Sequence, residues 1–361
     1  AARLLGRGPG RVFLDVVLPQ IRPAVLAGTL LVFLYAVSDF GAVELMRYET
    51  LTRAIFLAFG SLDLSAALAL SLNLGVLALL VVVLERIVSR GAPTRTTQRT
   101  LTGLAVPLGR WRGLATGAMS TFLGLALVAP LAVLVYWAVR GLVQDTVRAS
   151  ALTADLGDLV APAWNTVQVS LIAAIVSVVV VLPIAWLTVR YRSRIGDVSN
   201  ALVVSGFALP GLAIALALVF WALRVARIPS GSIGLLLFAY VVHFGAQALR
   251  AAEVAVASVP GRLDDAAKVL GAGPARRFVT VQLPLMTPGL LAGGGLVLLA
   301  TMKELPATLL LAPAGFQTLA TRTWQSTEDA FLADASIAAL LLVALSGVLT
   351  WTLVVRRSDA L

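Results

Sequence analysis

Three charged residues lie within long apolar stretches of this 361-residue chain, and they are its main candidates for chemistry. Asp39 lies in one apolar run, and Lys303 and Glu304 lie together in another. An ionisable side chain at membrane depth is costly, so it usually faces an interior cavity or a partner. We therefore predict that these three residues line or gate the path of a solute. A structural arrangement of the lysine with the carboxylates near the outer membrane interface is the alternative.

The sequence contains few residues that could act in enzymatic catalysis. The chain has no Cys, which excludes disulfides and thiolate metal sites, and its one histidine, His243, lies in an apolar run. A buried, hydrogen-bonded core histidine is the ordinary interpretation of such a position. No Ser/His/Asp set can be assembled, and no Walker A sequence is present, so the chain itself is not expected to hydrolyse ATP. We predict no catalytic residue and no dedicated metal site.

The charged positions belong to an internal repeat with a constant offset of 265 residues, which places Asp39 on Glu304. The same offset relates further pairs: Gly8-Pro9 and Gly273-Pro274, Phe13 and Phe278, Pro23 and Pro288. A repeat of this length indicates two homologous halves. Asp39 and Glu304 should therefore occupy equivalent helices of a pseudo-twofold pair.

A polar, basic segment precedes each charged position and carries a spaced motif. The second copy reads Asp265-Ala266-Ala267, three residues, Gly271, nine residues, then Val281-Gln282-Leu283-Pro284. The first copy reads Ala1-Ala2, three residues, Gly6, nine residues, then Val16-Val17-Leu18-Pro19. Because the first copy begins inside its motif and has no initiator Met, we expect the chain to be an N-terminally truncated piece of a longer protein.

The second motif copy predicts two short amphipathic helices that form a knob outside the membrane. Apolar residues at helical spacing predict the first helix: Leu263, Ala266, Ala267 and Leu270. Gly271 and Gly273 should end it, and Pro274 suits the first turn of the next. Pro284 and Pro288 are expected to break this second helix before the next apolar run. A protein partner could dock on such a knob.

Composition indicates a multi-pass membrane protein, since 59% of the residues are hydrophobic and 13% are charged. Apolar runs long enough to span a bilayer lie near 24–45, 65–86, 114–139, 163–189, 199–223, 232–251, 288–311 and 335–355. If the motif segments face the cytoplasm, most of the 28 Lys and Arg residues fall on that side, as the positive-inside rule requires. Their spread over many short loops also argues against nucleic-acid binding.

The motif resembles the "EAA" loop of binding-protein-dependent ABC importer permeases, whose pattern is Glu-Ala-Ala, three residues, Gly, nine residues, Ile-x-Leu-Pro. Here Asp replaces Glu and Val replaces Ile in the second copy. The resemblance implies an all-α, polytopic transmembrane helical bundle with the type I ABC importer (MetI-like) permease fold and two homologous halves. We expect 1–88 to be the C-terminal part of the first half, 89–112 a cytoplasmic linker, and 113–361 a complete second half of six spans with its loop at 257–287.

The resemblance also implies the partners. Two cytoplasmic ABC ATPase subunits would each grip one motif loop, and a soluble binding protein would deliver solute to the outer face of the bacterial inner membrane. The chain would bind no cofactor, with ATP and Mg on the ATPases, and it would contact the lipid bilayer but no nucleic acid. The loop residues implied in ATPase coupling are Ala1, Ala2, Gly6, Leu18, Pro19, Asp265, Ala266, Ala267, Gly271, Leu283 and Pro284.

The stretches 38–56 and 302–324 are similar to the corresponding parts of fused ferric-iron importer permeases, which implies iron as the solute. Asp39 and Glu304 carry the hard oxygen ligands that Fe(III) favours. Permeases for thiamine, phosphonate, polyamine or sulfate share much of this pattern and stay open as alternatives. An ion-coupled secondary transporter or a membrane scaffold would not need a docking knob in each half.

Overall fold

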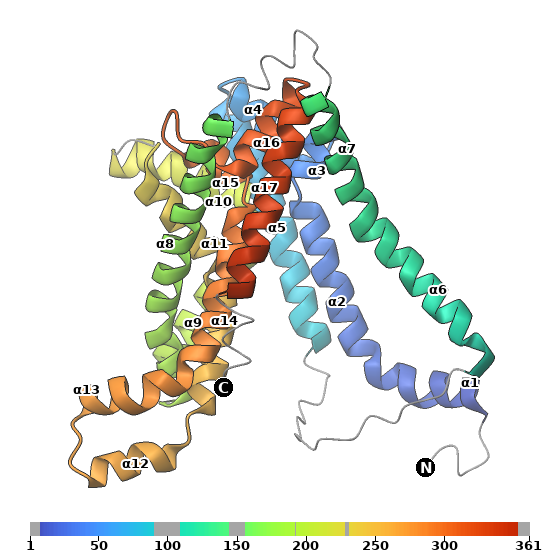
Figure 1. Cartoon of the computed structure of the whole chain (residues 1–361). Coiled ribbons are helices and arrows are strands. Elements are labelled where there is room, and N and C mark those ends of the chain that lie inside the picture. The colour runs from blue at the N-terminus through green and yellow to red at the C-terminus, as the bar shows by residue number, and fades with distance from the viewer. Residues whose placement is uncertain (1–7, 90–108, 144–155, 192, 228–230, 353–361) are drawn as a thin grey trace.

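The computed structural model describes residues 8–89, 109–143, 156–191, 193–227 and 231–352, and all regular elements within these ranges are helices (Figure 1). The predicted all-α class is thus confirmed. Ala1, Ala2 and Gly6 of the first motif copy lie outside the described residues, as does most of the predicted linker.

The helices form three consecutive groups along the chain. The first group is α1 (Pro9–Val12), the π-helical turn η1 (Phe13–Val17), α2 (Leu18–Ser38), α3 (Gly41–Leu45), α4 (Leu51–Gly60) and α5 (Leu64–Ser89). The second group is η2 (Gly109–Trp111), α6 (Arg112–Leu123), η3 (Gly124–Val128), α7 (Ala129–Val143), α8 (Leu156–Val189), α9 (Arg194–Ala208), α10 (Gly211–Trp221), η4 (Ala222–Ala226) and α11 (Ile233–Ser258). The third group is α12 (Gly261–Val269), α13 (Pro274–Arg277), η5 (Phe278–Gln282), α14 (Leu283–Met302), α15 (Pro306–Leu311), α16 (Leu319–Glu328) and α17 (Leu332–Thr350).

Within the described residues, six helices are long and apolar enough to cross a membrane, and the number rises to eight if each of two bent helix pairs is one span. These eight correspond to the eight predicted apolar runs. One bent pair is α9 and α10, which meet at 108° across Pro210-Gly211. Pro183, in contrast, lies inside α8, which continues through it from Leu156 to Val189.

The internal repeat has a structural counterpart in the first and third groups. The boundaries of α1 and η1 recur in α13 and η5 after 265 residues, and α2 and α14 then begin at Leu18 and Leu283. In both copies the π-helical turn closes with the same bond, from Leu18 N–H to Phe13 O and from Leu283 N–H to Phe278 O. Element order therefore supports two related halves, and the division at 89–112 stays a prediction.

The predicted break at Pro284 and Pro288 is wrong. The backbone runs as one helix from Pro274 to Met302, with Pro284 in the first turn of α14 and Pro288 in its interior. A proline is tolerated inside a membrane helix because neighbouring helices, Ser/Thr side chains and local π-helical turns can satisfy the freed carbonyl, whereas a full break would leave several backbone groups without partners. The π-helical turn at η5 takes up the irregularity instead.

Two predicted spans also end earlier than expected. The sequence predicts continuous spans at 24–45 and 288–311, but α2 ends at Ser38 and α14 ends at Met302. In the second case Pro306 has no N–H to donate to the carbonyl of Met302, which favours an end of the helix at this point. The consequence is that Asp39, Lys303 and Glu304 lie just beyond helix ends rather than inside helices.

The core is built from α8, α11 and α14, which pack closely because small residues face each other. A Cβ atom added to Gly293 would lie 2.7 Å from Ala251 Cβ, and one added to Gly289 would lie 2.7 Å from Ala255 Cβ. Such contacts let backbones approach closely, as expected for helices that associate in lipid. The small residues between Gly289 and Gly295 thus allow α14 to pack closely against α11.

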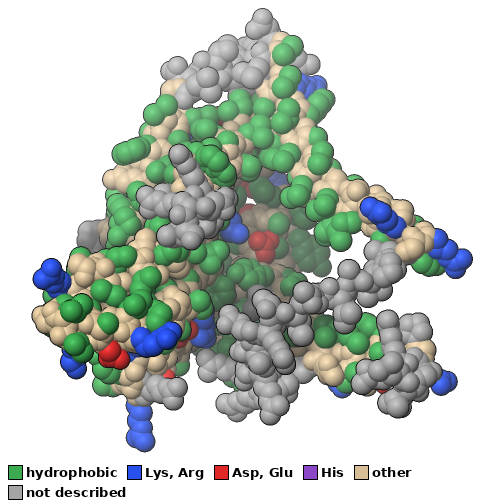
Figure 2. All heavy atoms as spheres, turned by 60° about the horizontal axis from the view of Figure 1, so that its bottom comes forward, with side chains coloured by type: hydrophobic (Ala, Val, Ile, Leu, Met, Phe, Trp, Pro, Cys, Tyr) green, Lys and Arg blue, Asp and Glu red, His purple; other side chains and the backbone are tan. Residues whose placement is uncertain are grey.

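The helical groups meet at one end of the molecule and spread apart toward the other (Figure 1). The short helices α4 and α16 lie at the closed end, and α12 and α13 form a foot at the open end. Viewed from the open end, the surface is hollowed between the spread helices, and acidic and basic side chains are visible inside the hollow (Figure 2). Charged side chains are thus present inside an otherwise apolar bundle.

Candidate functional site

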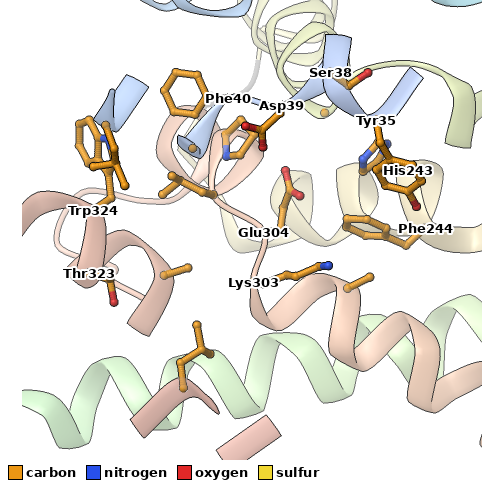
Figure 3. A pocket seen from close by; sticks show the side chains of 18 of the residues that line it. Tyr35, Ser38, Asp39, Phe40, His243, Phe244, Lys303, Glu304, Thr323 and Trp324 are labelled. Carbon is orange, nitrogen blue, oxygen red and sulfur yellow. The ribbon is translucent and has the colours of Figure 1, made fainter. Parts of the chain in front are cut away.

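The three predicted path residues meet at one cavity of about 490 Å³. Asp39 reaches it from the end of α2, and Lys303 and Glu304 reach it from the end of α14 (Figure 3). In Figure 3 the carboxyl group of Glu304 points to the side of the cavity from which Asp39 projects. The repeat positions Asp39 and Glu304 are therefore brought to one site from two helices that are far apart in sequence.

Asp39 has a fixed backbone and an exposed side chain. Its carbonyl oxygen accepts a hydrogen bond of 2.8 Å from Thr52 Oγ1 on α4. Behind it, Glu44 and Arg53 form a mostly buried ion pair with Oε2 and Nε 3.3 Å apart, and this pair ties α3 to α4. The side chain of Asp39 is thus presented to the cavity by a rigid support.

Glu304 is half-buried and is held more tightly. Its Oε1 accepts a hydrogen bond of 3.3 Å from Ala307 N at the start of α15. The same oxygen lies against Gly211 at the start of α10, where an added Cβ would be only 2.8 Å away. The starts of two helices, α15 and α10, therefore both lie against this carboxyl group.

Lys303 is exposed to the cavity next to the two acids. None of the ion pairs found among the described residues includes Lys303, Asp39 or Glu304. Likewise, the part of the chain that the structure describes holds no cluster of three or more His, Cys, Asp or Glu side chains that could hold a metal ion. The site is an open cavity with a mostly apolar lining, into which these three charged side chains project.

Aromatic side chains that the sequence did not point to form one wall of the cavity. Tyr35 meets Phe207 edge to face at 6.1 Å between ring centroids, and Phe207 stacks on His243 at 6.4 Å. The only available signal was that Tyr35 lies four residues before Asp39, on the same side of the chain as it leaves α2. Trp324 of α16 lies on another part of the lining.

His243 meets its expectation in part. It interacts with the backbone of Gly206, as expected for a hydrogen-bonded histidine, but it is half-buried on the cavity wall rather than in the core, and its Nδ1 has no hydrogen-bond partner among the described residues. Its Nε2 would lie 3.5 Å from a Cβ at Gly211, the glycine that also adjoins Glu304. The helix α11 delivers it there because α11 packs behind the break between α9 and α10.

The second motif copy lies far from the cavity, in the foot that α12 and α13 form. Asp265 and Ala266 are exposed on α12, and Val269 and Leu270 at its end are 87% and 86% exposed. Gly271 follows with a φ of +79°, a left-handed conformation that suits glycine. The first predicted short helix is therefore present as α12, whereas the second is the beginning of the long helix Pro274–Met302.

The foot is attached to the bundle through its second helix. Phe278 meets Trp186 of α8 edge to face, at 5.9 Å between centroids. Leu283 and Pro284, the end of the motif, form the first turn of α14. In the first copy, Leu18 and Pro19 occupy the same place in α2. The coupling role of these residues stays a prediction.

Comparison with known proteins gives the family. The pattern of the family described as "Binding-protein-dependent transport system inner membrane component" matches residues 1–92 and 181–359. Members of this family are transport permeases rather than enzymes, and the family implies a binding protein and an ATPase as partners.

Individual proteins show the same relationship. The Fe(3+)-transport system permease protein FbpB 2 of Haemophilus influenzae is 31% identical over 350 residues, which are 95% of this chain and 68% of that protein. The putative 2-aminoethylphosphonate transport system permease protein PhnV of Salmonella typhimurium is 29% identical over 117 residues, 32% of this chain and 44% of that protein.

Among solved structures, the inward-facing MetNI methionine ABC transporter covers 54% of this chain and 92% of its own chain, at 18% identity and a TM-score of 0.45. The family match, the relationship to the Haemophilus influenzae permease and the spanning helices agree with one another. The chain belongs to the family of binding-protein-dependent transport system inner membrane components and is a multi-pass inner membrane permease of an ABC transporter.

Proposed function

We propose that this chain is the permease of an ATP-driven importer of ferric iron. The observation that carries the proposal is the 31% identity, over 95% of the chain, with a permease named for Fe(3+) transport. In this proposal a soluble binding protein delivers iron to the outer face, and ATP hydrolysis on partner subunits drives the cycle. The ATP and Mg belong to those subunits, and this chain supplies the path.

The cavity provides chemistry suited to a hard cation in passage. Asp39 and Glu304 offer carboxylate oxygens, the ligand type that hard cations prefer. Lys303 beside them offsets part of the negative charge, so that a cation would be attracted without being held permanently. A permease must release its solute, and two carboxylates on different helices can separate when the halves move.

The motif loops provide the connection to the ATPases. We assign one ATPase subunit to each loop, so that the exposed tip of α12, with Val269 and Leu270, inserts into one of them. Burial of two large apolar side chains would contribute about 3 kcal/mol or more to docking. Closure of the ATPases would then move both loops and rock the halves between inward-open and outward-open states.

A second candidate solute is 2-aminoethylphosphonate. It is suggested by the similarity to PhnV over 117 residues and by Lys303, whose ammonium group could pair with a phosphonate while the acids pair with the amine. Both candidates keep the same cavity and the same ATPase contact.

Uptake measurements can distinguish ferric iron from 2-aminoethylphosphonate as the transported solute. Cells that produce the complete transporter, with its ATPase and binding protein, should accumulate radiolabelled ferric iron, and cells without this chain should not. Excess 2-aminoethylphosphonate should leave iron uptake unchanged. Uptake of labelled 2-aminoethylphosphonate without iron uptake would replace the first candidate by the second, and absence of ATP-dependent uptake of either solute would reject both.

A further inference from the structure

A single acidic side chain connects the two helices of the foot. Asp264 lies in the first turn of α12, next to the motif residue Asp265 but not part of the motif. Its Oδ2 accepts from Arg277 Nη1 at 3.0 Å, and its Oδ1 accepts from Gln282 Nε2 at 2.7 Å. The two oxygens therefore hold two different turns of the following helix, one in α13 and one in η5.

Little else in the described contacts would hold α12 in place. The chain reaches α13 from α12 through a short turn that contains Gly271, whose φ of +79° marks a point where the backbone changes direction. Apart from Asp264 and Ala267, all residues of α12 are exposed, and so is Leu270 at its end. Without the contacts of Asp264, α12 would be held mainly by this turn and by its two-residue connection to α11.

The helix that Asp264 grips runs directly to the cavity. Residues Pro274–Met302 form one continuous helix, and Lys303 and Glu304 follow immediately. The 20 residues of α14 alone extend over about 30 Å. At the foot, the same helix is fixed to α8 by Phe278 and Trp186. A displacement of α12 is therefore passed along this helix to Lys303 and Glu304 most directly when α12 and α13 move as one body.

We propose that Asp264 is the positioning residue that locks α12 to α13 and η5, so that force applied to the tip of α12 is transmitted to Glu304. This proposal rests on the proposed docking of an ATPase at α12. The ion pair is well placed for such a role, because the side chains of Arg277 and Asp264 are only 18% and 27% exposed and are therefore screened less than a surface pair.

The lock can be tested directly by distance measurement. The chain has no Cys, so Lys268→Cys on α12 and Thr280→Cys on η5 allow two spin labels to be placed at exposed positions. In the complete transporter, Asp264→Ala should broaden the distance distribution between the labels. The exchange Asp264→Arg with Arg277→Asp should narrow it again, since Gln282 can turn its amide to accept from the new arginine.

The functional consequence is measured in liposomes that contain the chain, its ATPase and its binding protein. Asp264→Ala should reduce iron uptake per ATP hydrolysed by at least about fivefold, the size of a typical coupling effect between sites. Co-purification with the ATPase should persist, and the exchanged pair should recover most of the uptake per ATP. Asp197→Ala, an exposed acid in the first turn of α9, is the matched control and should leave uptake per ATP unchanged.

Two results would overturn the proposal. An unchanged distance distribution in Asp264→Ala would show that other contacts fix α12. A broadened distribution with normal uptake per ATP would show that transmission does not need the lock. If the unsubstituted chain failed to bind any ATPase, the proposed docking would be rejected instead, and the distance measurement would still decide whether Asp264 holds α12.

Discussion

Gly211 and Glu304 lie so close that a side chain at position 211 would bring its Cβ to 2.8 Å from the Oε1 atom of Glu304. Gly211 starts α10 directly after the 108° break, and Glu304 follows α14. Their contact joins two broken helices at the cavity. It makes the position of the Glu304 carboxylate depend on the absence of a side chain at residue 211.

We expect Gly211→Ala to displace Glu304 and to lower uptake. Loss of the hydrogen bond from Ala307 N to the Glu304 carboxyl group corresponds to about 0.5–1.5 kcal/mol, or about twofold to tenfold in rate. Gly75→Ala is the control, because its Cβ would meet Leu209 at an ordinary 3.9 Å. Uptake is measured at equal amounts of inserted protein. Equal uptake by the two variants would contradict a positioning effect on Glu304.

The carboxylates themselves can be neutralised without change of shape. Asp39→Asn and Glu304→Gln should each reduce uptake by about tenfold, since each removes one charge from the cavity, while co-purification with the ATPase remains normal. A structural role predicts instead that the variants are lost from the membrane. Full uptake by the double variant would remove both residues from the mechanism.

The exposed tip of the foot should be the ATPase contact. Leu270→Asp places a charge on a side chain that is 86% exposed in the isolated chain and would be buried in the complex. Because burial of an unpaired charge costs several kcal/mol, co-purification with the ATPase should fall to background levels. Gly271→Pro should act similarly, since proline cannot adopt a φ of +79°. Normal ATPase binding by both variants would argue against docking at this tip.

The close packing of α11 and α14 should make the thermal stability of the protein sensitive to substitution at their contact. Gly293→Ala would place a methyl group 2.7 Å from Ala251 Cβ, and overpacking of this kind costs about 1–3 kcal/mol. We therefore expect a lower Tm in detergent. Gly347→Ala has no atom within 4 Å of the added Cβ and should have a Tm at or above that of the original chain. A normal Tm for Gly293→Ala would mean that the two helices can separate at no cost.

Topology can be checked with single cysteines in this Cys-free chain. Thr100→Cys, in the predicted linker, should react with a membrane-impermeant reagent only after the cells are opened. Asp329→Cys, next to α16 at the closed end, should react in intact cells. The opposite pattern would reverse the orientation that the distribution of Lys and Arg predicts.

The class of the protein and the positions of most helices could be predicted from the sequence. Repeated spacing placed Asp39 and Glu304 at equivalent points, and the structure ends both α2 and α14 just before them. Apolar runs located the spans, because hydrophobicity and helix length are local properties of a chain in lipid. The prediction of a helix break at Pro284 and Pro288 was wrong for a physical reason that cannot be inferred from the sequence. A membrane helix tolerates a missing N–H donor when a π-helical turn and its neighbours absorb the irregularity.

The tertiary structure alone decided which residues share a site. Phe207, Gly211 and His243 come from α9, α10 and α11, respectively. No helical periodicity relates them to Asp39 or Glu304. They meet because α9 and α10 turn sharply at Pro210, which brings the start of α10 against the end of α14. Asp264 likewise looked like an ordinary charge beside the motif until folding placed Arg277 and Gln282 within hydrogen-bond distance. The periodicity of a helix predicts which residues three and four positions apart are neighbours. The lining of a cavity and the contacts of Asp264 depend instead on packing between helices that are distant in sequence.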